Sequence, residues 1–144
     1  MKFIPYFTTS RYRVDAMVEL SKVEPGEKVV DLGSGDGRIA IAFAKTGALV
    51  DGYELDKALI KESEINIEKE NVTSKITILN KDFWEADLSS YNVVCVYPMP
   101  DIMKALETKL KKELRPGTKI LTNYYLFPNL KTETSKNNIY LYIK

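Results

Sequence analysis

The sequence has no histidine and a single cysteine among its 144 residues, and each shortage excludes a class of site. The usual zinc sites need histidine or several cysteines, and one cysteine forms no internal disulfide. Cys95 lies in the apolar run of residues 93–96, which is typical of a small buried side chain. We therefore expect neither a metal site nor a disulfide.

Long hydrophobic runs and an excess of charge of one sign are also missing. No uninterrupted apolar stretch is long enough to span a bilayer, and residues 1–6 lack the apolar core of a signal peptide. The formal net charge is +1 and the basic residues are dispersed, which argues against a nucleic-acid or membrane surface. We expect a soluble, cytoplasmic monomer that forms one domain over residues 1–144, with no membrane contact and no nucleic-acid partner.

The most informative segment present is VVDLGSGDGR at residues 29–38. An apolar strand ends in Asp31, and three alternating glycines then lead into a helical stretch. Such glycines allow a sharp turn and let a ligand lie against main-chain N–H groups at a helix start. The dinucleotide fingerprint needs a third glycine where this chain has Arg38, and Asp31 would repel a pyrophosphate. A ligand with a cationic end suits Asp31 better, which favours S-adenosyl-L-methionine with its ammonium and sulfonium groups.

Apolar patterns and turn residues predict alternating strands and helices. Ser10, Asp56 and Asp101 are expected to cap helices, and Gly47 is expected to end one. The expected strands are residues 28–32, 49–54, 75–79, 92–97, 118–124 and 139–143, and the expected helices are residues 10–20, 36–46, 56–71 and 101–114. This order predicts an α/β fold with a doubly wound, mostly parallel sheet and an antiparallel C-terminal edge strand.

Ligands of such sheets lie over the carboxyl ends of the strands, so the residues there are the candidates for a site. Glu54 ends the second strand and can accept hydrogen bonds from two ribose hydroxyls. Asp82 follows the third strand and can accept from an adenine amino group, while Phe83 or Leu55 packs on the ring. As alternatives, Asp82 is only a helix cap and Phe83 belongs to the core. Tyr97 ends the fourth strand, where it either orients a nucleophile or merely packs.

Three acids in this order, on three successive strand–helix units, resemble the class I (seven-stranded) S-adenosylmethionine-dependent methyltransferases. A narrower resemblance covers nearly the whole chain. It rests on FIP at 3–5, DLGSGDGR at 31–38, GYEL at 52–55, DFW at 82–84 with DLS at 87–89, KL at 109–110 with ELRPG at 113–117, and FP at 127–128. These segments are similar to the small protein-lysine methyltransferases, which include a broad-specificity archaeal enzyme and mitochondrial enzymes acting on an ATP-synthase subunit and the adenine nucleotide translocase.

The resemblance implies methyl transfer to exposed lysine side chains of proteins, with Tyr97 as the candidate catalytic residue. It also implies that the N-terminal segment and helix, residues 1–24, pack over the cofactor side, with Thr9 at a matching position. The hydrophobic anchor of the mitochondrial members is missing here, and the short stretch of residues 128–139 implies a reduced edge hairpin. The expected cofactor-binding residues are Thr9, Asp31, Gly33, Ser34, Gly35, Glu54, Leu55, Asp82 and Phe83.

Two other functions stay open at the level of sequence. One is a small-molecule or tRNA methyltransferase on the same fold, and the other is a non-catalytic partner subunit that binds the cofactor. The fourth strand ends in Tyr97 and Pro98, without the Asn/Asp-Pro-Pro-Tyr tetrapeptide of many adenine, cytosine and glutamine N-methyltransferases. That difference favours an amine acceptor over a planar amide or base.

Overall fold

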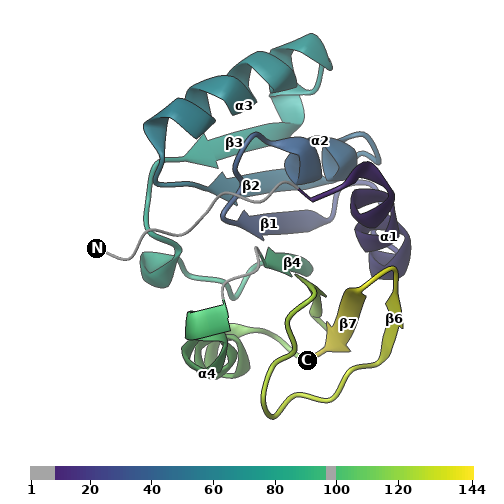
Figure 1. Cartoon of the computed structure of the whole chain (residues 1–144). Helices are drawn as coiled ribbons and strands as arrows, with labels where there is room; N and C mark the ends of the chain where they lie inside the picture. Colours follow the sequence, from purple (N-terminus) through teal and green to yellow (C-terminus); the bar gives the residue numbers. More distant parts are fainter. Residues whose placement is uncertain (1–8, 97–99) are drawn as a thin grey trace.

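The computed structural model describes residues 9–96 and 100–144 and contains a seven-stranded sheet. The strands are β1 (Lys28–Leu32), β2 (Leu49–Tyr53), β3 (Ile76–Leu79), β4 (Val93–Val96), β5 (Lys119–Asn123), β6 (Thr134–Lys136) and β7 (Ile139–Ile143). Their spatial order is β3-β2-β1-β4-β5-β7-β6, with β1 to β5 parallel to one another (Figure 1). The predicted doubly wound, mostly parallel sheet is therefore confirmed.

The C-terminal hairpin differs from the expectation in one respect. β7 is antiparallel to β5, as predicted, but it does not form the edge of the sheet. The edge is β6, which pairs with β7 and is three residues long. The hairpin is thus reduced, because the stretch of residues 128–139 is short. β6 still covers the outer edge of β7 by pairing with it.

The helices are α1 (Arg11–Ser21), α2 (Arg38–Ala44), α3 (Lys57–Lys69) and α4 (Met103–Glu113), with 3₁₀ turns η1 (Thr73–Lys75), η2 (Phe83–Glu85) and η3 (Pro100–Ile102). None of the helices described is both long enough and apolar enough to cross a bilayer.

Helix starts follow local side-chain chemistry at some positions and backbone constraints at others. Asp56 caps α3 as predicted, because its Oδ1 accepts from the backbone N–H groups of the second and third helical residues. The expected cap at Asp101 is wrong, since Pro100 opens a 3₁₀ turn and Ile102 precedes α4. The helix expected from residue 36 begins at Arg38, because Gly37 has a left-handed φ of 86°.

Apolar side chains cover both faces of the sheet. The helices α1, α2 and α3 pack on one face, where Met17 and Phe43 are fully buried, while α4 packs on the other through Leu106 and Leu110. Side chains alternate along β1, so Asp31 lies on the same face as Val29, which packs in the α1–α3 core. This packing holds the carboxyl ends of the parallel strands together at one edge.

Glu107 of α4 is a buried carboxylate that holds the segment after β5. It is 3% exposed, and it accepts hydrogen bonds from the N–H and side-chain amide of Asn129 and from the N–H of Leu130, at 2.8–2.9 Å. Burial opposes its ionisation, but these hydrogen bonds outweigh burial and lower the pKa of Glu107 below its ordinary value of 4.5. The ionised form therefore stabilises the fold.

Glu107→Gln is expected to lower the free energy of unfolding by about 1–2 kcal/mol at pH 7, because charge-assisted hydrogen bonds become neutral ones. A lowered folded-state pKa contributes stability above the ordinary pKa, and that contribution is lost as pH falls through the folded-state value. The difference between the proteins should therefore shrink below about pH 4.5.

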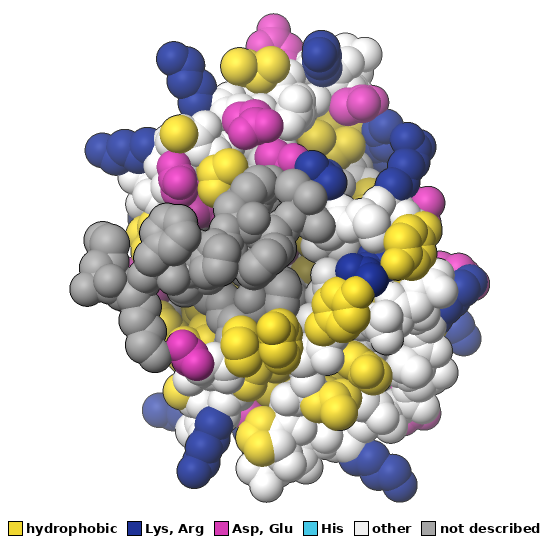
Figure 2. Space-filling model, viewed as in Figure 1, with side chains coloured by type: hydrophobic (Ala, Val, Ile, Leu, Met, Phe, Trp, Pro, Cys, Tyr) yellow, Lys and Arg dark blue, Asp and Glu magenta, His cyan; other side chains and the backbone are white. Residues whose placement is uncertain are grey.

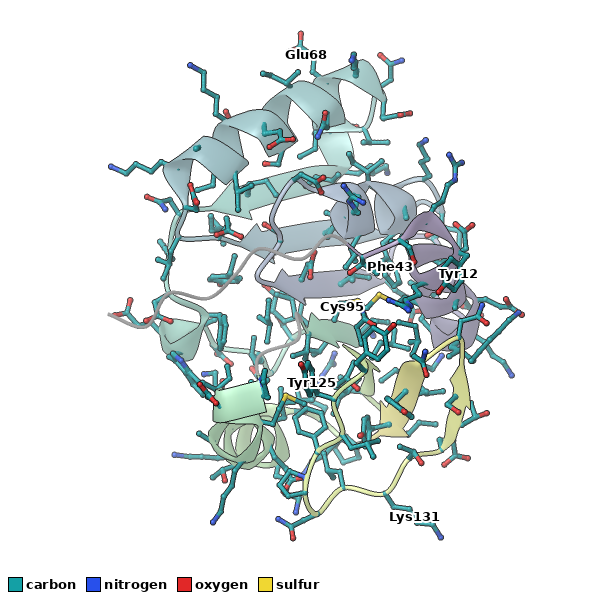
Figure 3. The ribbon with its side chains drawn as sticks, in the orientation of Figure 1. Tyr12, Phe43, Glu68, Cys95, Tyr125 and Lys131 are labelled. Carbon is teal, nitrogen blue, oxygen red and sulfur yellow. The ribbon has the colours of Figure 1, made fainter. Side chains whose placement is uncertain are left out.

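Urea unfolding at a series of pH values measures this difference. Glu68→Gln is the matched control, since Glu68 is an exposed residue of α3 far from this segment (Figure 3). A difference that is absent at pH 7, or equally large at pH 4, would show that the ionised side chain of Glu107 stabilises nothing.

Candidate cofactor site

Asp31 is a buried carboxylate without a partner in the described part of the chain. It is 1% exposed, and neither of its carboxylate oxygens receives a hydrogen bond from residues 9–96 or 100–144. Burial raises the pKa of Asp31 well above its usual value, and the nearby carboxylates of Glu54 and Asp36 raise it further. Buried carboxylates are normally paired, so this position is suited to a cationic group of a ligand.

The glycine-rich loop after β1 uses its own N–H groups within the protein. The N–H groups of Gly33 and Ser34 both donate to the carbonyl of Tyr53, at 2.9 and 3.0 Å. The N–H of Gly35 donates to Oε1 of Glu54 at 2.8 Å. These three N–H groups are thus bonded within the protein, and the expectation that Gly33, Ser34 and Gly35 contact the cofactor stays a prediction. A loop whose N–H donors are already bonded offers few of them to a pyrophosphate group.

Glu54 is held in place by backbone donors on both sides of its carboxylate. Besides the bond from Gly35 to Oε1, its Oε2 accepts from the N–H groups of Leu55 and Asp56, each at 3.0 Å. A carboxylate offers about four acceptor positions, so it retains capacity for a hydroxyl donor. The side chain that is predicted to bind ribose is thus fixed before any ligand arrives, and it is bonded directly to the glycine loop.

The loop packs directly against β2 because residue 52 is glycine. A Cβ at Gly52 would lie 2.8 Å from the Cβ of Ser34 and 2.8 Å from Cδ1 of Ile78, closer than real side chains approach. The hydroxyl of Ser34 is buried and has no partner among the described residues. The close contact between Gly52 and Ser34 sets the distance between the loop and the sheet. The hydroxyl of Ser34 is one more polar atom available at this edge.

Thr9 is joined to the same edge by two side chains that sequence reasoning did not place in the site. Arg38 donates to the carbonyl of Thr9 at 3.1 Å and pairs with Asp36 at 2.5 Å. Asn123, the last residue of β5, donates through Nδ2 to the hydroxyl of Thr9 at 3.3 Å. The rule that sites gather at strand ends could have identified Asn123, but no sequence signal links Arg38 to Thr9.

The residues after β3 lie along the same edge but are less closely joined to the loop. Asp82 is half-buried and accepts a hydrogen bond from the N–H of Trp84 at 3.0 Å, so it does cap η2. Phe83 packs against the ring of Trp84 and the α4-side core, whereas Leu55 is 62% exposed. Tyr97, the predicted catalytic residue, lies outside the described residues.

The ends of β1, β2 and β3 lie side by side, so their residues can contact successive parts of an elongated ligand. Neighbouring strands are about 4.8 Å apart, so the ends of β1, β2 and β3 span roughly 10 Å. The buried acid Asp31 on β1 can meet a cation, and Glu54 after β2 can meet hydroxyl groups. Asp82 after β3 can meet a ring amine. The residues therefore fit S-adenosyl-L-methionine, and their cofactor-binding roles stay a prediction.

The chain is similar to known methyltransferases over most of its length. Residues 31–134 match the family model described as the ANTKMT methyltransferase domain. A protein-lysine N-methyltransferase of Saccharolobus islandicus is 35% identical, with 97% of this chain and 93% of the relative covered. An adenine nucleotide translocase lysine N-methyltransferase of Mus musculus is 32% identical over 87% of this chain, which spans 55% of that relative.

A solved structure has the same fold, but it is described as an RNA methyltransferase and not as a protein methyltransferase. The RNA methyltransferase from Salinibacter ruber, crystallised with S-adenosyl-L-homocysteine, superposes with a TM-score of 0.90. It is 30% identical, and the match covers 95% of this chain and 93% of that one.

Proposed function

Since the chain belongs to the ANTKMT methyltransferase family, we propose that it transfers a methyl group from S-adenosyl-L-methionine to lysine side chains of protein substrates. The unpaired, buried carboxylate of Asp31 is the main structural support, because it matches a ligand with an ammonium group. The near full-length likeness to a protein-lysine N-methyltransferase supports lysine as the acceptor.

The residues at the sheet edge account for binding. Asp31 would hold the ammonium group, Glu54 the ribose hydroxyls and Asp82 the adenine amino group. When bound, the cofactor supplies an electrophilic methyl group on a sulfonium. The remaining task of the protein is to bring a neutral amine within about 3–3.5 Å of that carbon and in line with the bond that breaks. We propose that Tyr97, the residue that follows β4 in the sequence, orients this amine.

A lysine amine must lose its proton before it can accept a methyl group. With a pKa near 10.4, only about one lysine in two or three thousand is neutral at pH 7. The sequence has no histidine, the usual side chain for general base catalysis near neutral pH. We propose that the proton is lost to solvent before the amine enters the site.

The initial rate of methylation is therefore expected to rise close to tenfold per pH unit between pH 7 and about pH 9, because the neutral fraction of lysine rises in that proportion. Rates measured at saturating cofactor over this range test the expectation. A flat profile would contradict proton loss to solvent.

A matched pair of protein substrates tests the acceptor itself. A protein substrate should accept labelled methyl groups, whereas the same protein with acetylated lysines should accept none, because acetylation delocalises the lone pair of the lysine nitrogen into an amide and so removes its nucleophilicity. Equal labelling of both proteins would exclude lysine as the acceptor.

RNA is the second candidate substrate, because the similar Salinibacter ruber protein is described as an RNA methyltransferase. The formal net charge of only +1 and the dispersed basic residues argue against a polyanion as the substrate. Incubation of the protein with labelled cofactor and purified RNA separates the two candidate substrates. Label on the RNA would support RNA as the substrate.

A further inference from the structure

Four large apolar side chains lie exposed together beside the candidate site. Tyr12 lies on α1, and Tyr124, Tyr125 and Leu126 follow β5 directly; they are 53%, 48%, 40% and 55% exposed. Figure 2 shows hydrophobic side chains gathered on this face, and Figure 3 shows Tyr12 and Tyr125 on the two segments. We call these four residues the tyrosine surface. Exposed apolar groups that gather in this way are typical of binding surfaces.

The tyrosine surface is held together by Arg13. The guanidinium carbon of Arg13 lies 4.1 Å from the ring centroid of Tyr124 and 5.4 Å from that of Tyr12. The same side chain donates a hydrogen bond to the hydroxyl of Tyr124. The start of α1 and the segment after β5 are thereby joined, so the rings are presented in a fixed arrangement.

The backbone at Tyr124 is strained in a way that keeps its ring outside the core. Its φ is 68°, a left-handed value that is costly for a residue with a Cβ and usual for glycine. The N–H of Tyr124 donates to the carbonyl of Asn138, and the N–H of Tyr125 turns back to the carbonyl of Asn123. An exposed aromatic side chain kept at a strained position points to a role in binding.

The tyrosine surface continues from the candidate cofactor site. In the sheet register Asp31 pairs with Cys95, and Cys95 pairs with Leu121, two residues before the end of β5. The end of β5 therefore lies about 10 Å from β1 across two strand spacings. A ligand resting on the tyrosine surface is within reach of β4, which lies between them.

The charges of the two regions differ. Asp31, Glu54 and Asp82 line the edge formed by β1 to β3, where Asp36 is paired with Arg38, whereas the tyrosine surface is apolar apart from Arg13. Since the cofactor would occupy Asp31, Glu54 and Asp82, a substrate beside it meets the tyrosine surface, which suits apolar side chains of a protein. A nucleic acid could stack bases on the tyrosines, but its phosphates would meet carboxylates at the adjoining edge.

We propose that the tyrosine surface docks the protein substrate through an apolar side chain about two or three residues from the methyl-accepting lysine. This spacing follows because an extended chain advances about 3.3 Å per residue, and the end of β5 lies roughly 5 Å from β4 and roughly 10 Å from β1, the two strands between which the methyl group would be transferred. The inference rests on the proposed lysine methyltransferase function, since it assigns the part of the substrate that surrounds the lysine.

A pair of peptides tests the docking. Each carries one lysine and the same charges, and they differ only in leucine or serine three positions from the lysine. The wild-type protein should methylate the leucine peptide with a kcat/KM on the order of tenfold higher. The double variant Tyr125→Ser with Leu126→Ser should lose that preference and keep its affinity for S-adenosyl-L-methionine. Ile65→Ser, on the exposed side of α3, should keep both and serves as the matched control.

The outcomes separate the docking from the proposed function. Equal methylation of both peptides by the wild-type protein overturns the docking alone. Methylation of neither peptide, with label entering purified RNA, overturns both. A double variant that keeps the preference shows that the tyrosine surface does not dock the substrate. A wild-type protein that elutes as a dimer in gel filtration, with a double variant that elutes as a monomer and keeps the preference, shows that the surface binds a second copy of the chain instead.

Discussion

Glu54→Ala is expected to weaken the binding of S-adenosyl-L-methionine by two to four orders of magnitude. Hydrogen bonds from two ribose hydroxyls to a charged acceptor are worth about 1.5–3 kcal/mol each. The carboxylate also fixes the N–H groups of Gly35, Leu55 and Asp56, so its loss frees the glycine loop as well. Isothermal titration calorimetry of the purified protein measures the change in affinity.

Two further variants make this result specific. Glu54→Gln keeps one oxygen acceptor without the charge, so its affinity should lie between those of the wild-type protein and the alanine variant. Glu62→Ala removes an exposed carboxylate of α3 and should leave the affinity unchanged. Wild-type affinity in Glu54→Ala would mean that Glu54 only organises the loop and does not bind the cofactor.

Asp31→Asn is expected to stabilise the protein and to impair cofactor binding at the same time. The buried carboxylate has no partner among the described residues, so removing its charge should raise the free energy of unfolding by about 1–2 kcal/mol at pH 7. The same change removes the counter-charge for an ammonium group and should weaken binding by at least tenfold. A gain in stability at the cost of binding is the trade-off expected of a residue that serves a ligand and not the fold.

The pH dependence of stability tests the same residue. Because burial raises the folded-state pKa of Asp31, the folded protein binds a proton more tightly than the unfolded chain. Stability from this group therefore falls as pH rises above its ordinary pKa of 3.8, until the raised pKa is passed.

Asp31→Asn should lack that fall in stability. Asp15→Asn, at an exposed position of α1, should retain it and serves as the matched control. Denaturant unfolding without cofactor provides the measurement. A destabilised Asp31→Asn variant with an unchanged pH profile would show that Asp31 is paired in the folded protein.

Much of the fold follows from local patterns in the sequence. The bounds of β1 agree with the strand expected at residues 28–32, and the acid at residue 56 caps α3 as its position predicts. Hydrophobic alternation and turn residues are local signals, so they locate elements well. The same signals place Asp31, Glu54 and Asp82 at neighbouring strand ends, because parallel strands share one carboxyl edge.

The features that sequence reasoning missed depend on long-range contacts. Nothing near Gly33 or Gly35 in the sequence shows that their N–H groups donate to Tyr53 and Glu54 on the neighbouring strand segment. The bonds from Arg38 and Asn123 to Thr9 join parts of the chain 29 and 114 residues apart. The position of β6 at the sheet edge likewise depends on pairing with β7, which a three-residue strand signals too weakly to predict.

Identification of the methylated atom tests the central claim most directly. The wild-type protein is incubated with isotopically labelled S-adenosyl-L-methionine and a mixed extract of protein and RNA, and the products are digested and analysed by mass spectrometry. Glu54→Ala provides the background, because it should transfer little label. The account predicts labelled methyl groups on lysine Nζ atoms of proteins, dependent on Glu54. Label confined to RNA nucleotides or small molecules, with none on lysine, would contradict it.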